Sequence, residues 1–211
     1  MRPLTLVSVV ALVGTTLAQY LCETELAFYK SKLIPDVLAD FQPQKKLFLT
    51  FTDDQGAEVA VERPGEQLTM KETANIPKVE LSADVFDGSI PHLLDPDAPT
   101  PEDRHWSPVR HWIAPNYASQ WGGVDDRYEL KNSTPAYSEY ISPAPPYGAH
   151  RYVVLVYRQN KIAELQTPWE YNRDSVLSFD FKGFMNAQNE TEFTLIAGTY
   201  FSVSPDPVKP S

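Results

Sequence analysis

Cysteine is almost absent from this chain of 211 residues. Cys22 is the single cysteine, so no disulfide can form within the chain, and the stability of the fold must come from its apolar core. Because Cys22 opens a helical pattern, we expect it to be buried or half-buried as a small apolar side chain. A free thiol and an intermolecular bridge are the two alternatives.

Basic residues are too few to balance the acidic ones. Lysine and arginine number 18 against 28 aspartates and glutamates, which gives a formal net charge of −10. Phosphate backbones repel such a chain, and no basic stripe offsets the repulsion, so nucleic acid is not an expected partner. The sequence also lacks a Gly-x-Ser-x-Gly elbow, a His-Glu-x-x-His helix, a phosphate-cradling glycine loop and a Cys-x-x-Cys pair. We therefore expect no enzyme activity, no metal and no cofactor.

Long apolar runs are also missing, except at the amino terminus. Arg2 gives a positive start, residues 4–18 are apolar apart from Thr and Ser, and Ala18 ends a stretch of small residues. The run is shorter than the ~20 residues that span a bilayer. We predict a signal peptide over 1–18, a single secreted domain over 19–211 and no transmembrane segment; a retained anchor is the alternative. Removal of Arg2 with the leader would change the net charge from −10 to −11.

Two glycosylation sequons agree with the secretory route. They begin at Asn132 and Asn189, and Pro135, directly after the first sequon, should lower its use. Such triplets also arise by chance, so they support the compartment without proving it.

The periodicity predicts a helix over 24–41, which Pro35 interrupts, with a second short helix over 36–40. A further helical segment is expected over 175–187. The expected strands share short runs of apolar or β-branched residues bounded by turn signals, and they cover 47–51, 58–62, 79–81, 110–114, 151–157 and 194–202.

Proline is abundant, with 19 residues, and its clusters at 96–108 and 142–148 predict stiff loops in place of long regular elements. The strands do not alternate regularly with helices. This order favours a β-rich α+β domain, in which an antiparallel or mixed sheet carries peripheral helices.

Asp95 and Asp97 form the densest polar cluster. Pro96 favours an extended backbone at Asp95, and two carboxylates at i and i+2 would then share a face at the end of a strand. An Asp-Pro turn with solvated acids is the structural alternative.

Two histidines stand beside apolar strands. His111 lies on a short one, where a hydrogen-bonded core histidine is the more common outcome. His150 and Arg151 follow the proline-rich loop 142–148 and precede 153–157, a run that is apolar on both faces and therefore central in a sheet. The two residues would lie at the edge of the core, where a pocket can form, although Arg151 could equally pair with a carboxylate.

Taken together, these segments resemble the phosphatidylethanolamine-binding protein family. The motifs that carry the resemblance are Asp95-Pro96-Asp97-Ala98-Pro99, His111-Trp112, Pro145-Pro146, Gly148 and His150-Arg151-Tyr152, with Ile34-Pro35-Asp36-Val37-Leu38 near the start and Ala197-Gly198-Thr199-Tyr200-Phe201 near the end. The resemblance implies a central antiparallel sheet with a smaller second sheet and peripheral helices. The chain departs from the family at Ala144, where a glycine is usual, and in a shorter segment before His150. Strand parity places His92 opposite Asp95, so we expect His92 to be structural or exposed.

The resemblance also implies a ligand site and a function. The implied pocket takes phosphate-like groups or phospholipid headgroups and is lined by Asp95, Asp97, Pro99, His111, Pro146, His150 and Tyr152. Protonated His111 and His150 could donate to the anion, with the carboxylates holding them charged. Alternatively, Asp95 or Asp97 accepts from a ligand ammonium or hydroxyl group while backbone amides of the proline-rich loop bind the anion. Inhibition of a secreted protease such as a carboxypeptidase, or another protein interaction, is the alternative. A pocket-based enzyme is a third, weaker one.

Overall fold

The structure, a computed structural model, describes residues 5–85, 88–123, 125–159, 175–187 and 193–205, with side chains from residue 17 onward. The helices are α1 (Thr5–Lys30), α2 (Leu33–Asp36) and α3 (Phe181–Ala187). The strands are β1 (Leu47–Thr52), β2 (Glu58–Val61), β3 (Glu66–Leu68), β4 (Lys78–Leu81), β5 (Ser89–Asp95), β6 (Val109–Ile113), β7 (Tyr117–Trp121), β8 (Tyr128–Asn132), β9 (His150–Gln159) and β10 (Phe193–Val203). The six strands predicted from the sequence are present with ends shifted by one or two residues.

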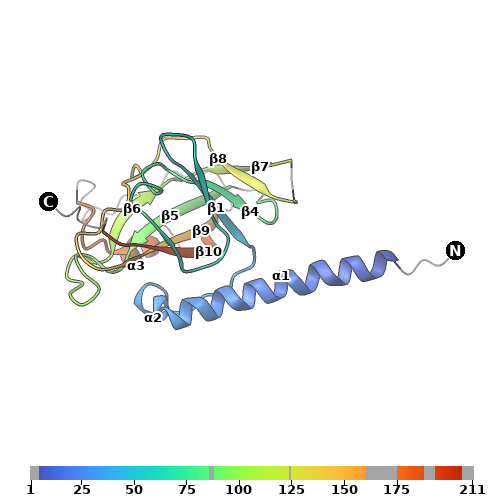
Figure 1. The fold of residues 1–211 in the computed structure, drawn as a ribbon, viewed down its shortest axis with the longest axis horizontal. Helices are drawn as coiled ribbons and strands as arrows, with labels where there is room; N and C mark the ends of the chain where they lie inside the picture. Colours follow the sequence, from blue (N-terminus) through green and yellow to red (C-terminus); the bar gives the residue numbers. More distant parts are fainter. Residues whose placement is uncertain (1–4, 86–87, 124, 160–174, 188–192, 206–211) are drawn as a thin grey trace.

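Hydrogen bonds join the described strands into one mixed sheet (Figure 1). The order is β2-β1-β4-β8-β7-β5-β9-β10-β3, and β6 pairs with β5 outside this path. The β10–β3 pair is parallel, whereas the other pairs are antiparallel. The β-rich α+β class is therefore confirmed. The smaller sheet implied by the resemblance is continuous with the central one in the described residues.

Two apolar clusters lie on the two faces of the central strands. The first lies between β5, β9 and β10 on one side and β1 and β4 on the other, so the sheet folds back over itself. The second lies between the same central strands and the helices. The side chains of β9 alternate between the clusters because successive residues of a strand point to opposite faces: Tyr152, Val154 and Val156 join the first, and Val153, Leu155 and Tyr157 join the second.

Strand β5 is buried along its whole length, yet it contains a proline. The carbonyl of Pro91 accepts the N–H of Ala114, which shows that its own nitrogen faces the β6–β7 side. On that side β5 changes partner, from β7 at Ser89 to β6 at His92. The missing N–H therefore falls between two ladders and interrupts neither.

The helices differ from the prediction. Helix α1 begins well before residue 24 and ends at Lys30, because Lys32 takes a left-handed conformation with φ of 60°. The second helix is α2, four residues long, in place of 36–40, and α3 covers only the last part of 175–187. No helix among the described residues has the length and apolar character needed to cross a membrane.

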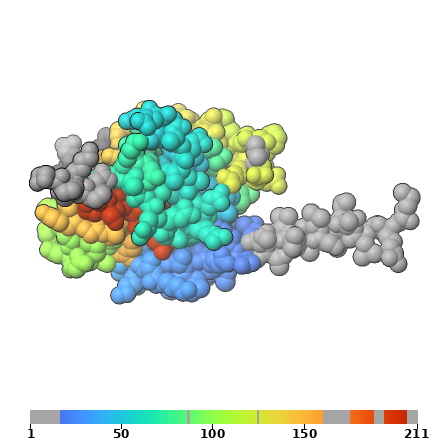
Figure 2. All heavy atoms as spheres, viewed as in Figure 1, coloured from blue at the N-terminus to red at the C-terminus, as the bar shows by residue number. Residues whose placement is uncertain are grey.

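The carboxyl-terminal half of α1 packs on the domain, which Figure 2 shows in blue along one flank. Phe28 is fully buried, and Tyr20 already makes contact, with the Lys46 ammonium 4.5 Å from its ring centre. Cys22 lies on the outer side of the helix and is exposed. The expectation that Cys22 is buried is therefore wrong, because its position on α1 faces away from the sheet.

Candidate functional site

The end of β5 and the start of β9 bring a carboxylate and an imidazole together. Asp95 and His150 are 3% and 0% exposed, and the His150 Nδ1 atom lies 2.8 Å from Asp95 Oδ2. The Nε2 atom lies 3.1 Å from the carbonyl oxygen of Tyr147. A carboxylate and a carbonyl can only accept hydrogen bonds, so both ring nitrogens must carry hydrogen. His150 is thus an imidazolium in this arrangement, paired with Asp95.

The surroundings of His150 favour this charged form. Burial opposes the charge, but the hydrogen bond and the charge of Asp95 outweigh it and raise the pKa of His150 above its ordinary value. Asp97 adds a smaller attraction, and the Tyr147 carbonyl acts in the same direction. The charge of the ring is therefore supported by neighbours on two segments of the chain, 95–97 and the turn at Tyr147.

His111 lies in β6, and a β-bulge directs its side chain toward the ring of Tyr152. In the β5–β6 ladder Leu93 faces Trp112 and Leu94 faces Arg110, so His111 is the extra residue between two paired neighbours. Such bulges re-aim a side chain. The His111 ring lies edge-on to Tyr152, with 5.1 Å between ring centres, and Nδ1 donates to the carbonyl of Ile141 at 2.8 Å.

His111 differs from His150 in charge. Burial is the main effect and lowers the pKa of His111, the Ile141 carbonyl and Asp95 act against it, and the charge of His150 adds to the lowering. The lowered pKa of His111 favours its neutral form over the protonated form expected from the sequence, because burial outweighs the effects of Asp95 and the Ile141 carbonyl. With hydrogen on Nδ1, neutral His111 offers Nε2 as an acceptor.

Asp97 points to a different set of partners from Asp95. Its Oδ2 accepts the backbone N–H and the Nε–H of Arg151, each at 2.8 Å, and its Oδ1 lies 2.6 Å from Arg151 Nη2 and 3.1 Å from Arg104 Nε. Asp36 joins the cluster through Arg151 at 3.0 Å and Arg104 at 2.7 Å. These donors outweigh burial and lower the pKa of Asp97. The ligand contact predicted for Asp97 stays a prediction, since its observed contacts hold the chain together.

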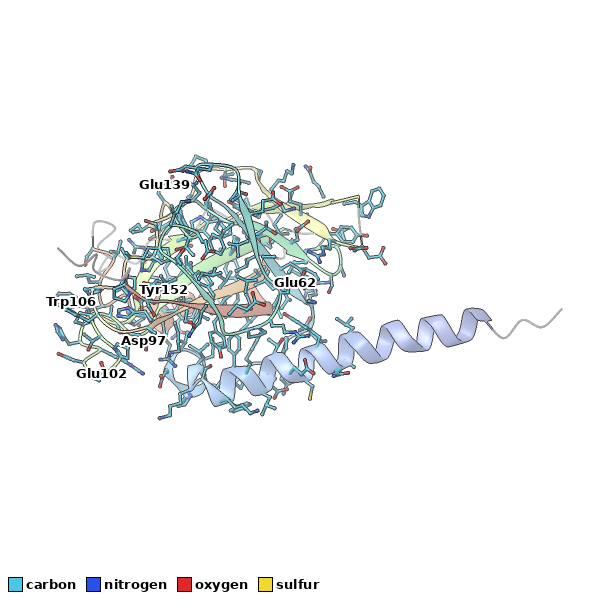
Figure 3. All side chains as sticks on the ribbon, in the orientation of Figure 1. Glu62, Asp97, Glu102, Trp106, Glu139 and Tyr152 are labelled. Carbon is cyan, nitrogen blue, oxygen red and sulfur yellow. The ribbon has the colours of Figure 1, made fainter. Side chains whose placement is uncertain are left out.

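The remaining predicted residues are Tyr152, Pro99 and Pro146, of which Tyr152 stacks on His150 with 6.4 Å between ring centres. Tyr152 is buried, and burial together with the charge of Asp95 raises its pKa. Pro99 is half-buried, and Pro146 is exposed in the turn before Tyr147. Figure 3 shows Asp97 and Tyr152 at the same end of the molecule as Trp106 and Glu102.

The turn at Tyr147 covers the Nε2 side of His150. Gly148 has φ of 72°, and a Cβ placed on it would lie 3.0 Å from Pro101 Cδ, so a glycine is needed there. The Tyr147 side chain is 71% exposed, while its carbonyl turns inward to His150.

The pairing of Arg151 with a carboxylate, one of the alternatives that the sequence left open, is confirmed by its contacts with Asp97. The Tyr147 carbonyl and the contact of Arg104 with Asp97 were not predicted from the sequence, because neither leaves a local pattern.

Residues 90–201 match the family described as phosphatidylethanolamine-binding protein. The chain belongs to this family. The matched region contains the Asp95–His150 pair, His111, and Asp97 with its two arginines, and it covers more than half of the chain.

Two relatives align with most of the chain. An uncharacterized protein of Saccharomyces cerevisiae is 25% identical over 189 residues, which is 82% of this chain and 90% of the relative. A 26 kDa secreted antigen of Toxocara canis is 27% identical over 177 residues, which is 82% of this chain and 62% of that protein.

Solved structures show the fold of this family member. A carboxypeptidase Y inhibitor complexed with its cognate proteinase superimposes with a TM-score of 0.66 at 22% identity, over 87% of this chain and 95% of that chain. A phosphatidylethanolamine-binding protein from Plasmodium vivax gives 0.59 at 16% identity, over 87% and 98%. At these identities the similarity concerns the fold alone.

Two further predictions concern His92 and the glycosylation sequons. His92 is buried among the rings of Tyr157, Phe181 and Phe184, and burial lowers its pKa to about 3, which confirms a structural place. Asn132 is exposed at the end of β8, whereas Asn189 lies outside the described residues, and glycosylation stays a prediction for both. No group of three or more metal-ligating side chains occurs in the described ranges.

The Asp95–His150 pair predicts a pH-dependent stability. His150 has a folded-state pKa above the unfolded value of about 6.5, so its stabilisation is complete below that pH and is lost as pH rises through the raised pKa. His92 and His111, with lowered pKa values, act in the opposite direction and below about pH 6.5. We expect the free energy of unfolding in urea to decline as pH rises above about 6.5, through the raised pKa of His150.

The decline should be absent in His150→Gln. It should persist in His105→Gln, which changes an exposed histidine. An equal decline in wild type and His150→Gln would show that another group is responsible.

Proposed function

We propose that this family member is a secreted binding protein whose ligand is a phosphate-like group or a phospholipid headgroup, held at the Asp95–His150 pair. The observation that carries the proposal is the buried ring of His150, whose Nδ1 lies 2.8 Å from Asp95 Oδ2 and whose Nε2 lies 3.1 Å from the Tyr147 carbonyl oxygen, an arrangement that favours the charged ring. An anionic oxygen is a better acceptor for a charged donor than a carbonyl is. If the Tyr147 turn moves aside, the phosphate oxygen takes the place of its carbonyl.

Neutral His111 gives the site a hydrogen-bond acceptor beside the charged donor of His150. With its Nδ1–H on the Ile141 carbonyl, its Nε2 accepts from a ligand ammonium or hydroxyl group. Ethanolamine phosphate carries both an anion and an ammonium, and the two histidines in their different charge states complement the two ends. Asp95 holds the first ring charged and is itself neutralised by it, so the anion does not meet a free carboxylate.

The proposed protein is secreted, and it binds its ligand without catalysing a reaction. Secretion is supported by the leader pattern over 1–18, by the two sequons and by a relative named as a secreted antigen. The binding role is supported by His150 and Asp95, which pair with one another, and by His111, which donates to a main-chain carbonyl.

Titration calorimetry with O-phosphoethanolamine tests the ligand. We expect saturable binding near pH 6 that weakens as pH rises through the His150 titration. Asp95→Asn and His150→Gln should each weaken binding about ten- to hundredfold, because a charge-assisted hydrogen bond of ~1.5–3 kcal/mol is lost. His105→Gln is the matched control and should bind as wild type.

Circular dichroism establishes that the variants are folded. Should Asp95→Asn lose its fold, the pH series on wild type still tests the same pair. Equal affinity at about pH 5.5 and pH 8, or unchanged affinity in both variants, would overturn the proposal.

A second candidate function is inhibition of a secreted serine carboxypeptidase. It is favoured by the superposition with a carboxypeptidase Y inhibitor in complex with its proteinase and by the exposure of the proline-rich turn, in which Tyr147 is 71% exposed. Here the turn or the amino-terminal segment would contact the protease. An inhibition assay with carboxypeptidase Y distinguishes the two functions, since headgroup binding alone leaves peptidase activity unchanged.

A further inference from the structure

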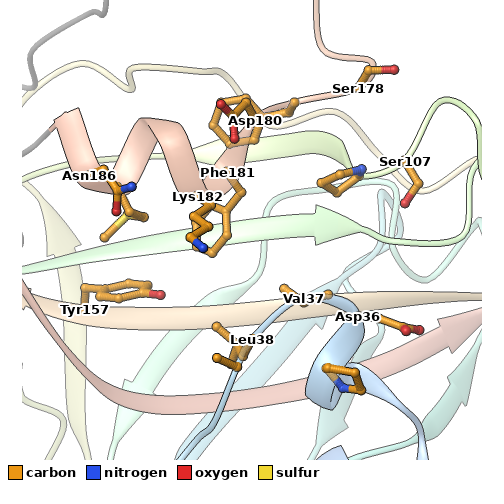
Figure 4. Close-up of a pocket in the computed structure, with 15 residues that line it drawn as sticks. Asp36, Val37, Leu38, Ser107, Tyr157, Ser178, Asp180, Phe181, Lys182 and Asn186 are labelled. Atoms are coloured by element: carbon orange, nitrogen blue, oxygen red, sulfur yellow. The ribbon is translucent and has the colours of Figure 1, made fainter.

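A cavity lies away from the Asp95–His150 pair. It has a volume of about 740 Å³ and opens between the chain just after α2 and the segment that leads into α3 (Figure 4). Its floor is Tyr157 of β9. We call it the α2–α3 cavity, and none of the residues predicted for the headgroup site lines it. A neighbouring hollow of about 410 Å³ shares Leu38, Ala39 and Tyr157 with it.

The walls of the α2–α3 cavity are mostly apolar. Val37 and Leu38 form one side, and Phe179, Phe181 and Met185 form the other. Cavities of ~300–1,000 Å³ with apolar walls and a few polar groups are typical of small-molecule sites. The body of a ligand in this cavity is therefore a hydrocarbon.

The polar groups of the cavity differ in how they are engaged. Asp36 is paired with Arg104 and Arg151, and Asp180 accepts the N–H of Gly183 at 2.8 Å. Lys182 has no acidic partner in the part of the chain that the structure describes. Asp36 is thus paired with two arginines, whereas Asp180 keeps its negative charge, and the Lys182 ammonium is the cation available to a ligand.

Figure 4 shows the Lys182 ammonium and the Tyr157 hydroxyl directed into the same cavity from two walls. Burial raises the pKa of Tyr157, so its hydroxyl stays protonated and donates. An ammonium and a hydroxyl donor together bind a carboxylate. The polar end of the ligand is therefore an acid.

We propose that the α2–α3 cavity binds a fatty acid, with its hydrocarbon chain on Leu38, Phe181 and Met185 and its carboxylate on Lys182 and Tyr157. The site is independent of the headgroup site, since the two have no lining residue in common.

Titration calorimetry with laurate tests the proposal, at about 0.15 M salt so that the negative net charge of the protein is screened. We expect one saturable site on the full domain. Dodecyltrimethylammonium, which has the same chain and a cationic head, should bind at least tenfold more weakly. Lys182→Gln should weaken laurate binding about tenfold or more, because a charge-assisted hydrogen bond is lost.

Met185→Trp should abolish binding by filling the cavity. Lys131→Gln, which changes an exposed lysine of β8, is the matched control and should bind laurate as wild type. Asp95→Asn should also leave laurate binding unchanged, which separates this site from the proposed headgroup site.

Thermal melts identify any unfolded variant, and the comparison of the two head groups then tests the proposal on wild type alone. Absence of saturable binding, equal affinity for both head groups, or loss of binding in Asp95→Asn would overturn it.

Discussion

Arg151→Leu should lower the free energy of unfolding by about 3–5 kcal/mol. Asp97 is 1% exposed, and Arg151 supplies two of the side-chain contacts to its oxygens, at 2.8 and 2.6 Å. The substitution leaves a buried carboxylate with Arg104, itself partly exposed, as its remaining cation. It also removes the contacts of Arg151 with Asp36 and with the carbonyl of Ser31.

Urea unfolding followed by tryptophan fluorescence measures this loss. Arg63→Leu, at an exposed position, is the control and should change stability by no more than about 0.5 kcal/mol. The double variant Asp97→Asn with Arg151→Leu should recover part of the loss, because no charge is then buried without a partner and the amide oxygen still accepts the backbone N–H of residue 151. A double variant as unstable as Arg151→Leu would show that the effect comes from lost packing.

Phe28→Ala should cost about 3–5 kcal/mol, the range for removal of a buried aromatic side chain. The Phe28 ring is fully buried, with its centre 4.6 Å from that of Phe41 and 5.9 Å from that of Tyr200. Gly198 permits this close packing, since a Cβ there would lie 3.2 Å from the tip of Phe28. The substitution removes the main contact that holds α1 on the sheet.

The neighbouring residue is the control for this prediction. Tyr29 is 49% exposed, and Tyr29→Ala should change the free energy of unfolding by less than about 1 kcal/mol. Urea unfolding of the two variants under the same conditions gives the comparison. Similar losses in both would mean that α1 does not pack through the Phe28 face.

Much of the fold could be predicted because strand patterns are local. The run at 153–157 is apolar on both faces, and it forms part of the central strand β9. Alternate side chains of this strand lie in the two apolar clusters. The helical segment was less well predicted. Lys32 is left-handed, and this conformation, which ended the first helix, depends on packing around residues 33 and 34.

The sequence by itself determined a β-rich chain with one cysteine, a leader-like amino terminus and the motifs of the phosphatidylethanolamine-binding protein family, because composition, periodicity and short motifs are properties of neighbouring residues. The tertiary structure decided which charges meet. His150 is an imidazolium since Asp95 and the Tyr147 carbonyl both face it, and the bulge at His111 aims a second, neutral ring at the same place. Charge states depend on the distances between groups and on burial, and both arise only when segments more than fifty residues apart, such as Asp95 and His150, pack together.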